Sequence, residues 1–382
     1  MYDDIGRLKT PKYRLWNGVF ALPVGVGEDC YSHNLPTFCA TGSFIWRPDY
    51  TTVPAVSVPV TYCFGMDVVL APRTGFSLQS PVIAASGTFG YGTEFASQND
   101  LSGLGALVCK GTTRQPRAGN EPLRMAETAA GMLNAIGLQN IGVEAVVRDK
   151  APVWSTWSVP ILVNVSGVSI DEYVAVTALL DRVPGVAGIE LNISCPNVKE
   201  GGVAFGTNPR MAAEVTRAVR ATTALPLLVK LSPNVRDIQE VALAVEGAGA
   251  DAISLINTVY GMAIDAGRRR PLLANGSGGL SGPAIKPLAL YLVYQVAQAV
   301  SVPVVGLGGI MTAEDAIEFL LAGASAIAVA TLLLVDPTAW RDLDKGIEAW
   351  CQREGVRRLQ EVIGAANPQY KGRTGELPLT GS

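Results

Sequence analysis

The chain has 382 residues, of which 48% are apolar and 16% are charged, and its formal net charge is −3. This length is enough for one large domain or two ordinary ones. The charged fraction lies well below the roughly 25% usual for soluble domains, which indicates extensive burial and excludes disorder as the main state. The longest basic run is the triplet Arg268 to Arg270, so a nucleic-acid-binding surface is excluded and a small-molecule ligand is favoured.

The N-terminus and the cysteines indicate the compartment of the protein. Residues 1–4 do not begin a basic segment followed by an apolar one, as a signal peptide would. The six Cys are scattered rather than clustered in a disulfide framework. The best candidate for a membrane span, residues 319–335, is a little short and is interrupted by Gly323 and Ser325. We interpret it as a helix end, a glycine stop and a strand, and we expect a cytoplasmic protein.

Composition divides the chain into three segments. Residues 1–66 are rich in aromatic residues, Pro and Gly and follow no sustained period, so we interpret them as an irregular N-terminal extension. Residues 67–363 carry the pattern of the main domain, and residues 364–382 contain few apolar residues, which predicts a loosely ordered tail. In the extension, a motif of the form Cys-x-x-His fits no standard zinc pattern, so we favour incidental thiols over a metal site. The residues in question are Cys30, His33, Cys39 and Cys63.

Short apolar runs rich in Val, Ile and Leu recur through the main domain, and each is followed by a loop and a helical pattern. Their hydrophobicity is continuous rather than alternating, which is typical of parallel strands covered by helices. Eight such units predict a (β/α)8 TIM barrel. A doubly wound open sheet is the alternative, but residues 86–90 do not fit its G-x-G-x-x-G turn. The runs are Pro81 to Ser86, Ala106 to Lys110, Pro160 to Ser166, Gly188 to Ser194, Pro226 to Ser232, Ala252 to Thr258, Pro303 to Gly309 and Ala326 to Thr331.

The helices between these runs have recognisable ends. Asn208 followed by Pro209 predicts an N-cap before a helix over residues 211–220. Asp237 to Val245 is expected to close at Gly247, and Thr312 is expected to cap a helix over residues 313–321 that closes at Gly323.

Two connections are too long for plain barrel turns. They run from Gly111 to Val159 and from Asn257 to the helix after Pro287. Long loops at the C-terminal ends of the strands are where a barrel builds its active site.

Polar residues recur at the C-terminal ends of the predicted strands. A single one would be a cap or a turn former, but several strands ending in this way predict a common polar mouth. Lys110 and Lys230 each end a strongly apolar run, and because burial of an ammonium group is costly without an anion, they indicate an anionic ligand. The residues are Ser86, Lys110, Asn164, Asn192, Cys195, Asn197, Lys230, Asn257 and Thr258.

The candidate base is Cys195. The only His of the chain, His33, lies outside the barrel, so a general acid or base must be another residue type. Cys195 follows the fourth strand, and its thiol is acidic enough for proton abstraction. A buried, inert thiol is the alternative, and Cys109, inside a strand, is our example of that case.

Glycines after the seventh strand indicate a phosphate site. Gly308 and Gly309 follow that strand, Ala330 and Thr331 end the eighth, and Gly282 offers a further backbone donor. Loops after strands seven and eight of this fold commonly bind phosphate through backbone N–H groups. A phosphate site and a polar mouth without a metal-ligand cluster suggest a phosphorylated organic cofactor.

At this point the sequence resembles a known family. Residues 132–140, 189–197, 229–234 and 278–287 closely resemble motifs of the dihydroorotate dehydrogenase catalytic subunit, particularly the two-subunit, NAD-linked type B enzymes. The likeness covers about residues 67–360. It implies FMN-dependent oxidation of dihydroorotate to orotate in de novo pyrimidine biosynthesis.

The resemblance also assigns site residues. Cys195 would be the catalytic base that removes a proton from C5 of dihydroorotate while a hydride leaves C6 for the flavin, and Lys230 would stabilise the reduced flavin. FMN would be bound by Ser86, Lys110, Gly111, Asn164, Asn192, Lys230, Ile256, Gly282, Gly308, Gly309, Ala330 and Thr331. Orotate would be bound by Lys110, Asn134, Ala135, Ile136, Gly137, Leu138, Asn192, Asn197, Asn257 and Thr258.

Two departures from the family accompany the likeness. Ala330 stands where the family usually has Gly, and its methyl group could crowd the phosphate site. Residues 1–66 have no counterpart in the family pattern.

The resemblance further implies an FAD and iron–sulfur electron-transfer subunit, with a homodimer of this chain inside a heterotetramer. Two other functions are conceivable. A flavin reductase of uracil-like pyrimidines would share the Cys base, but Lys110 and the 134–138 stretch favour orotate. A non-catalytic flavin-binding protein would lack the base.

Overall fold

The computed structural model describes residues 65–97, 99–194 and 205–372. Eight short strands within these ranges each fall inside one of the predicted apolar runs, and every one of them is buried along its whole length. They are β3 (Val82–Ala84), β4 (Ala106–Val108), β7 (Ile161–Val165), β8 (Gly188–Asn192), β9 (Leu227–Lys230), β10 (Ala252–Leu255), β15 (Val304–Leu307) and β16 (Ala326–Val329).

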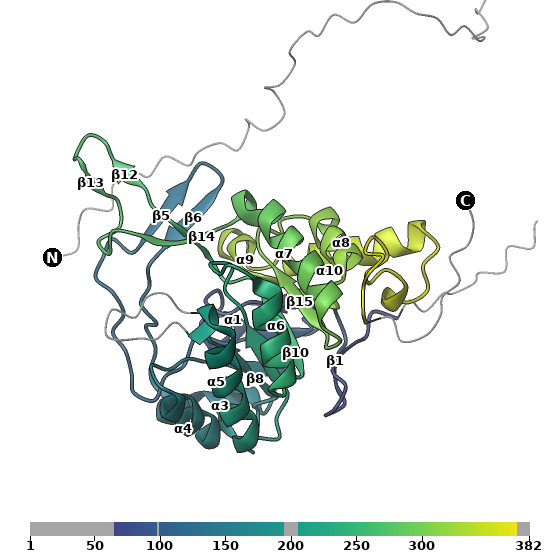
Figure 1. Cartoon of the computed structure of the whole chain (residues 1–382), viewed down its shortest axis with the longest axis horizontal. Helices are drawn as coiled ribbons and strands as arrows, with labels where there is room; N and C mark the ends of the chain where they lie inside the picture. The colour runs from purple at the N-terminus through teal and green to yellow at the C-terminus, as the bar shows by residue number, and fades with distance from the viewer. Residues whose placement is uncertain (1–64, 98, 195–204, 373–382) are drawn as a thin grey trace, which may run out of the picture. The chain divides into compact units, whose positions relative to one another are not determined.

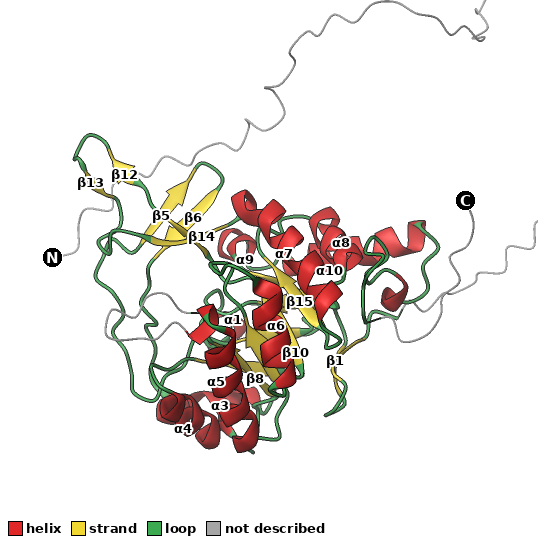
Figure 2. Cartoon of the chain, viewed as in Figure 1, coloured by secondary structure: helices red, strands yellow, loops and turns green. Residues whose placement is uncertain are grey.

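These strands pair in parallel and close into a barrel in the order β10-β15-β16-β3-β4-β7-β8-β9. The predicted (β/α)8 barrel is therefore confirmed, and the open sheet is excluded. Figure 2 shows helices (red) around the strands (yellow). The helices are α1 (Thr93–Ala96), α2 (Val143–Ala145), α3 (Ala151–Trp154), α4 (Ile170–Leu180), α5 (Pro209–Thr222), α6 (Ile238–Gly247), α7 (Lys286–Ala299), α8 (Ala313–Ala322), α9 (Thr331–Val335) and α10 (Trp340–Arg353), with a π-helical turn at Val146–Lys150 between α2 and α3.

The predicted helix starts are observed. Asn208, Asp237 and Thr312 each accept hydrogen bonds from backbone N–H groups of the first turn of α5, α6 and α8. Helix α8 ends at Gly323 in the left-handed conformation, as expected, whereas α6 includes Gly247 and turns only at Gly249, where φ is 102°. Within the described ranges, no helix combines the length and the apolar character that a membrane crossing requires.

The two long connections form a second, antiparallel sheet together. Its order is β11-β14-β6-β5, so strands from the connection after β4 pair directly with strands from the connection after β10. Figure 1 shows this sheet and a two-stranded ribbon at one end of the barrel. The strands are β5 (Met125–Thr128), β6 (Gly131–Asn134), β11 (Val259–Gly261) and β14 (Gly278–Ser281), and the ribbon is β12 (Ile264–Asp265) with β13 (Arg270–Pro271).

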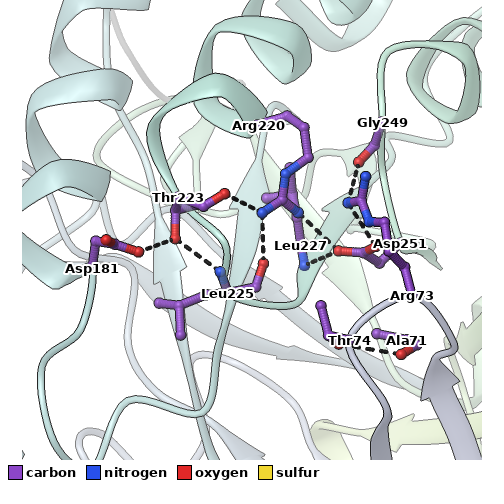
Figure 3. Close-up of polar contacts among 10 residues, drawn as sticks. All are labelled: Ala71, Arg73, Thr74, Asp181, Arg220, Thr223, Leu225, Leu227, Gly249 and Asp251. Atoms are coloured by element: carbon purple, nitrogen blue, oxygen red, sulfur yellow. Dashed lines mark hydrogen bonds and ion pairs between the residues drawn. The ribbon is translucent and has the colours of Figure 1, made fainter.

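At the opposite end of the barrel, a buried carboxylate connects β9, α5 and an N-terminal hairpin to the start of β10. Asp251, directly before β10, accepts a hydrogen bond of 2.8 Å from the Leu227 backbone and pairs with Arg220 at 2.9 Å and with Arg73 at 2.7 Å (Figure 3). Arg73 lies in the turn of a hairpin formed by β1 (Val68–Ala71) and β2 (Phe76–Leu78). This end of a barrel commonly serves stability rather than catalysis.

The segment after α10 packs against the barrel as far as residue 372. Asn367 is fully buried, and its side-chain amide donates to the carbonyl groups of Tyr294 and Ala322 at 3.0 and 2.9 Å. Because buried polar groups are held by such bonds, residues 364–372 do not have the loose order that we expected from residue 364 onward. The remainder of the expected tail, residues 373–382, lies outside the described residues.

Candidate active site

A cavity of about 450 Å³ opens at the C-terminal ends of the barrel strands. This volume is in the range of small-molecule sites. All of the residues that we expected to bind FMN line this cavity: Ser86, Lys110, Gly111, Asn164, Asn192, Lys230, Ile256, Gly282, Gly308, Gly309, Ala330 and Thr331.

Most of the residues expected to bind orotate line the same cavity, namely Lys110, Asn134, Ile136, Gly137, Leu138, Asn192, Asn257 and Thr258. Ala135 differs, because its side chain is fully buried with Leu133 and Leu273 on the other side of the sheet. Ala135 directly follows β6, and alternation of side chains continued past Asn134 explains the difference, since neighbours in extended chain point to opposite faces. Cys195 and Asn197 lie outside the described residues, as do Cys30, His33, Cys39 and Cys63.

The antiparallel sheet brings Asn134 to the cavity. Asn134 pairs with Met125 on one side and with Gly279 on the other, and both Asn134 and Met125 line the cavity. A Cβ atom at Gly279 would overlap the side chain of Thr258. Glycine at this position therefore allows the sheet to approach the end of β10.

A chain of hydrogen-bonded side chains crosses the cavity wall. The Asn192 amide donates to Asn164 Oδ1 at 3.2 Å, and Asn192 Oδ1 accepts from the Ser194 hydroxyl at 2.9 Å. The Ser194 hydroxyl accepts from the Asn257 amide at 2.6 Å, and Asn257 Oδ1 accepts from the Thr258 backbone at 2.9 Å. The backbone N–H groups of Ser194 and Thr258 can only donate, so they fix which end of the Asn192 and Asn257 amides carries the oxygen. The cavity thus presents amides in a defined orientation.

A buried carboxylate that the sequence analysis did not single out lies below this chain. Glu190, in β8, accepts hydrogen bonds from the Asn164 amide at 2.6 Å and from the Ser254 hydroxyl at 2.9 Å. Its Oε2 atom lies 3.9 Å from Lys230 Nζ, and both side chains are almost fully buried. An acidic residue in the middle of an apolar run was the available signal, since carboxylates are rarely buried without partners.

Two cations line one part of the cavity. Burial lowers the pKa of the Lys110 ammonium, and the charge of the nearby Arg124 guanidinium lowers it further. Arg124 donates to Gln139 Oε1 at 2.7 Å and to the Asn120 carbonyl at 3.3 Å. In the described part of the chain, neither cation forms an ion pair. Arg124 was missed because it lies in a long connection, far from the end of any predicted barrel strand, where no pattern marked it.

Glycine backbone forms the other part of the cavity. Gly282, Gly308 and Gly309 have φ angles of 95°, 133° and 76°, a region that side chains rarely adopt. Ala330, by contrast, has a φ of −121°, outside the left-handed region that favours glycine. These residues follow β14, β15 and β16, which places the glycine-rich part at the end of the seventh and eighth barrel strands.

Cys109 behaves as the inert thiol that we expected. Its side chain is fully buried, and burial raises the pKa of the thiol to about 12. A thiol with this pKa remains protonated at neutral pH, so Cys109 cannot act as a base there.

Comparison with known proteins gives a consistent result. The model of the dihydroorotate dehydrogenase family matches residues 72–350. A protein of Desulforudis audaxviator (strain MP104C) is 56% identical over 293 residues, which cover 77% of this chain and 95% of that protein. A protein of Geotalea uraniireducens (strain Rf4) is 55% identical over 291 residues, which cover 76% of this chain and 95% of that protein. Both are named dihydroorotate dehydrogenase B (NAD(+)), catalytic subunit.

The family match extends over the whole barrel, from the turn after β1 to α10. It includes both connections that build the sheet beside the cavity. The chain therefore belongs to the dihydroorotate dehydrogenase family.

Proposed function

We propose that the cavity is the site at which this flavin-dependent oxidoreductase binds FMN and oxidises dihydroorotate to orotate, a step of pyrimidine biosynthesis. The observation that carries the proposal is the composition of this single cavity. Glycine backbone after β14 and β15, oriented Asn amides and the cations Lys110 and Arg124, which form no ion pair within the described residues, all line it. A flavin phosphate, a planar amide-rich ring and a carboxylate require these three kinds of group.

The glycine-rich part suits the phosphate of FMN. Gly308, Gly309 and Gly282 let the backbone approach a ligand closely, and Ala330 and Thr331 add donors at the end of β16. Ser86, Lys110, Gly111, Asn164, Asn192, Lys230 and Ile256 would hold the remainder of FMN. When bound, the flavin supplies the hydride acceptor for C6 of dihydroorotate.

The remaining lining groups suit the substrate. Lys110 attracts the carboxylate of dihydroorotate, and Arg124 adds positive charge beside it. Asn134, Asn192 and Asn257 donate to and accept from the ring amides, as would Asn197. Ile136, Gly137, Leu138 and Thr258 complete the wall around the ring. Cys195 removes the proton from C5, and Lys230 supplies positive charge that stabilises the reduced flavin.

We further propose that electrons leave through a partner subunit. The named relatives are catalytic subunits of NAD-linked enzymes, which supports a partner for this chain. The sequence contains neither a dinucleotide fingerprint nor clustered Cys for an iron–sulfur cluster, so we assign FAD and the cluster to that partner. A heterotetramer built on a homodimer of this chain follows from the family resemblance.

Within the chain, we assign catalysis to residues 67–363 and treat residues 1–66 as an extension outside the catalytic domain. We propose a cytoplasmic location for this reaction, because scattered rather than clustered Cys are typical of a reducing compartment.

The cofactor can be identified directly. The purified chain is expected to be yellow and to release about one FMN per chain on heating, because the loops after the seventh and eighth strands suit a monophosphate. Mass spectrometry of the released flavin checks this. Recovery of FAD alone, or of no flavin from folded protein, would refute the proposal.

The partner can be tested by the choice of electron acceptor. With dihydroorotate as donor, the isolated chain is expected to reduce artificial dyes but not NAD, because its sequence contains no dinucleotide-binding fingerprint. Steady-state assays with each acceptor check this, with dye reduction as the positive control. Efficient NAD reduction by the isolated chain would show that no partner is needed.

The base is tested by Cys195→Ala. This variant is expected to retain FMN and to bind orotate, but to lose about 10² to 10⁴ in the rate of flavin reduction, the usual contribution of a positioned base. Cys195→Ser should be similarly slow near neutral pH, since a hydroxyl without a His partner is a far weaker base than a thiolate.

Anaerobic stopped-flow bleaching measures these rates, and Cys109→Ala is the control for loss of a buried thiol. Bleaching of Cys195→Ala at the parental rate would place the base elsewhere. Loss of orotate binding together with the rate would instead indicate a collapsed loop.

A further inference from the structure

One buried carboxylate connects four neighbouring strands below the cavity. Glu190 in β8 contacts Asn164 of β7, Lys230 of β9 and Ser254 of β10. Strand register brings these residues to neighbouring positions inside the barrel. Asn164 is paired with Glu190 and Ser254 with Lys230, and Lys230 is in turn paired with Asn192, two residues beyond Glu190 in β8. Asn164 and Lys230 line the cavity, whereas Glu190 and Ser254 do not. Glu190 can therefore affect a ligand only through its neighbours.

Glu190 forms a buried ion pair with Lys230. The two side chains are 4% and 5% exposed, and within the described residues neither forms another ion pair. The thiol of Cys109 also interacts electrostatically with Glu190, but its pKa of about 12 keeps it neutral. Removal of one member of a buried pair leaves the other charge uncompensated, which is far more costly than loss of an exposed pair. The position of the Lys230 ammonium hence depends on Glu190.

We propose that Glu190 is a positioning residue for the reaction: its carboxylate holds the Lys230 ammonium and the Asn164 amide in place at the floor of the cavity. This inference rests on the proposed function, in which both neighbours bind FMN. Glu190 acts on flavin reduction through Lys230, whereas the orotate contacts depend on Glu190 only through its hydrogen bond to Asn164.

The chain offers substitutions that separate charge from hydrogen bonding. In Glu190→Gln, the new amide can face Asn164 with its oxygen and Ser254 with its NH2 group, because a hydroxyl can also accept. The hydrogen bonds can thus be kept while the charge is lost. Ser254→Ala is the matched control, since it removes one hydrogen bond to Glu190 and keeps the carboxylate.

The experiment is a double-mutant cycle with Glu190→Gln and Lys230→Gln in the FMN-loaded chain. Anaerobic stopped-flow bleaching by dihydroorotate gives the rate of flavin reduction, and the spectral shift of the flavin on adding orotate gives its Kd. Glu190→Gln is expected to slow reduction about tenfold, within the range of coupling between residues in contact, and to change the Kd of orotate less than about threefold. The double variant should be no slower than Lys230→Gln alone, and Ser254→Ala should stay near the parental rate.

If Glu190→Gln loses FMN during purification, the same cycle is measured as FMN affinity by fluorescence quenching of the flavin. The affinity lost in Glu190→Gln should then be absent in the Lys230→Gln background. A Glu190→Gln variant with the parental rate of flavin reduction and the parental FMN affinity would overturn the inference. So would a double variant in which the effects of the two single substitutions multiply. Failure of the parental chain to bind FMN or to bleach would instead reject the proposed function, so the two failures are distinguishable.

Discussion

Closure of eight parallel strands into a barrel is the constraint on which the rest of this structure depends. Strand β10 is hydrogen-bonded to both β9 and β15, so the sheet has no free edge and all strands point in the same direction. All carboxyl ends consequently meet at one mouth. Residues as distant in sequence as Ser86 and Thr331 thereby line one cavity. The outer helices exclude water from the strands. Polar side chains inside the barrel must therefore form hydrogen bonds with other protein groups.

The polar residues inside the barrel form hydrogen bonds with one another. Glu190 lies at the lower end of a chain that continues through Asn164 and Asn192 to Ser194 and Asn257. An ionised carboxylate can only accept and backbone N–H groups can only donate, so both ends of the chain fix the orientation of the amides between them. The same bonds that make burial tolerable also fix the pattern of donors and acceptors presented to a ligand.

Sequence patterns were sufficient for the barrel because its strands are buried on both faces and read as apolar runs. Helix starts such as Asn208 and Thr312 were predictable as well, since capping is a local interaction. The polar strand ends that we singled out line the cavity, apart from Cys195 and Asn197, which lie outside the described ranges. Ala135, which only the family resemblance assigned to orotate, does not line it.

Features that depend on distant partners were not predictable. The sheet beside the cavity pairs β6 with β14, from connections that are far apart in the chain, and no local pattern encodes that pairing. Arg124 reaches the cavity only because this sheet brings it there. Asn367 resembles a loop residue in sequence, yet its amide is buried against α7 and α8. Its order comes from tertiary hydrogen bonds rather than from composition.

The central claim is that this one cavity holds both the flavin and dihydroorotate. An anaerobic titration of the purified, flavin-loaded chain with dihydroorotate, followed by absorbance of the flavin and by quantification of orotate, tests it most directly. The yellow colour is expected to bleach with about one equivalent of dihydroorotate per flavin, and an equal amount of orotate should form, since a hydride carries both electrons that the flavin accepts. A flavin that stays oxidised with excess dihydroorotate, or that bleaches without forming orotate, would contradict it.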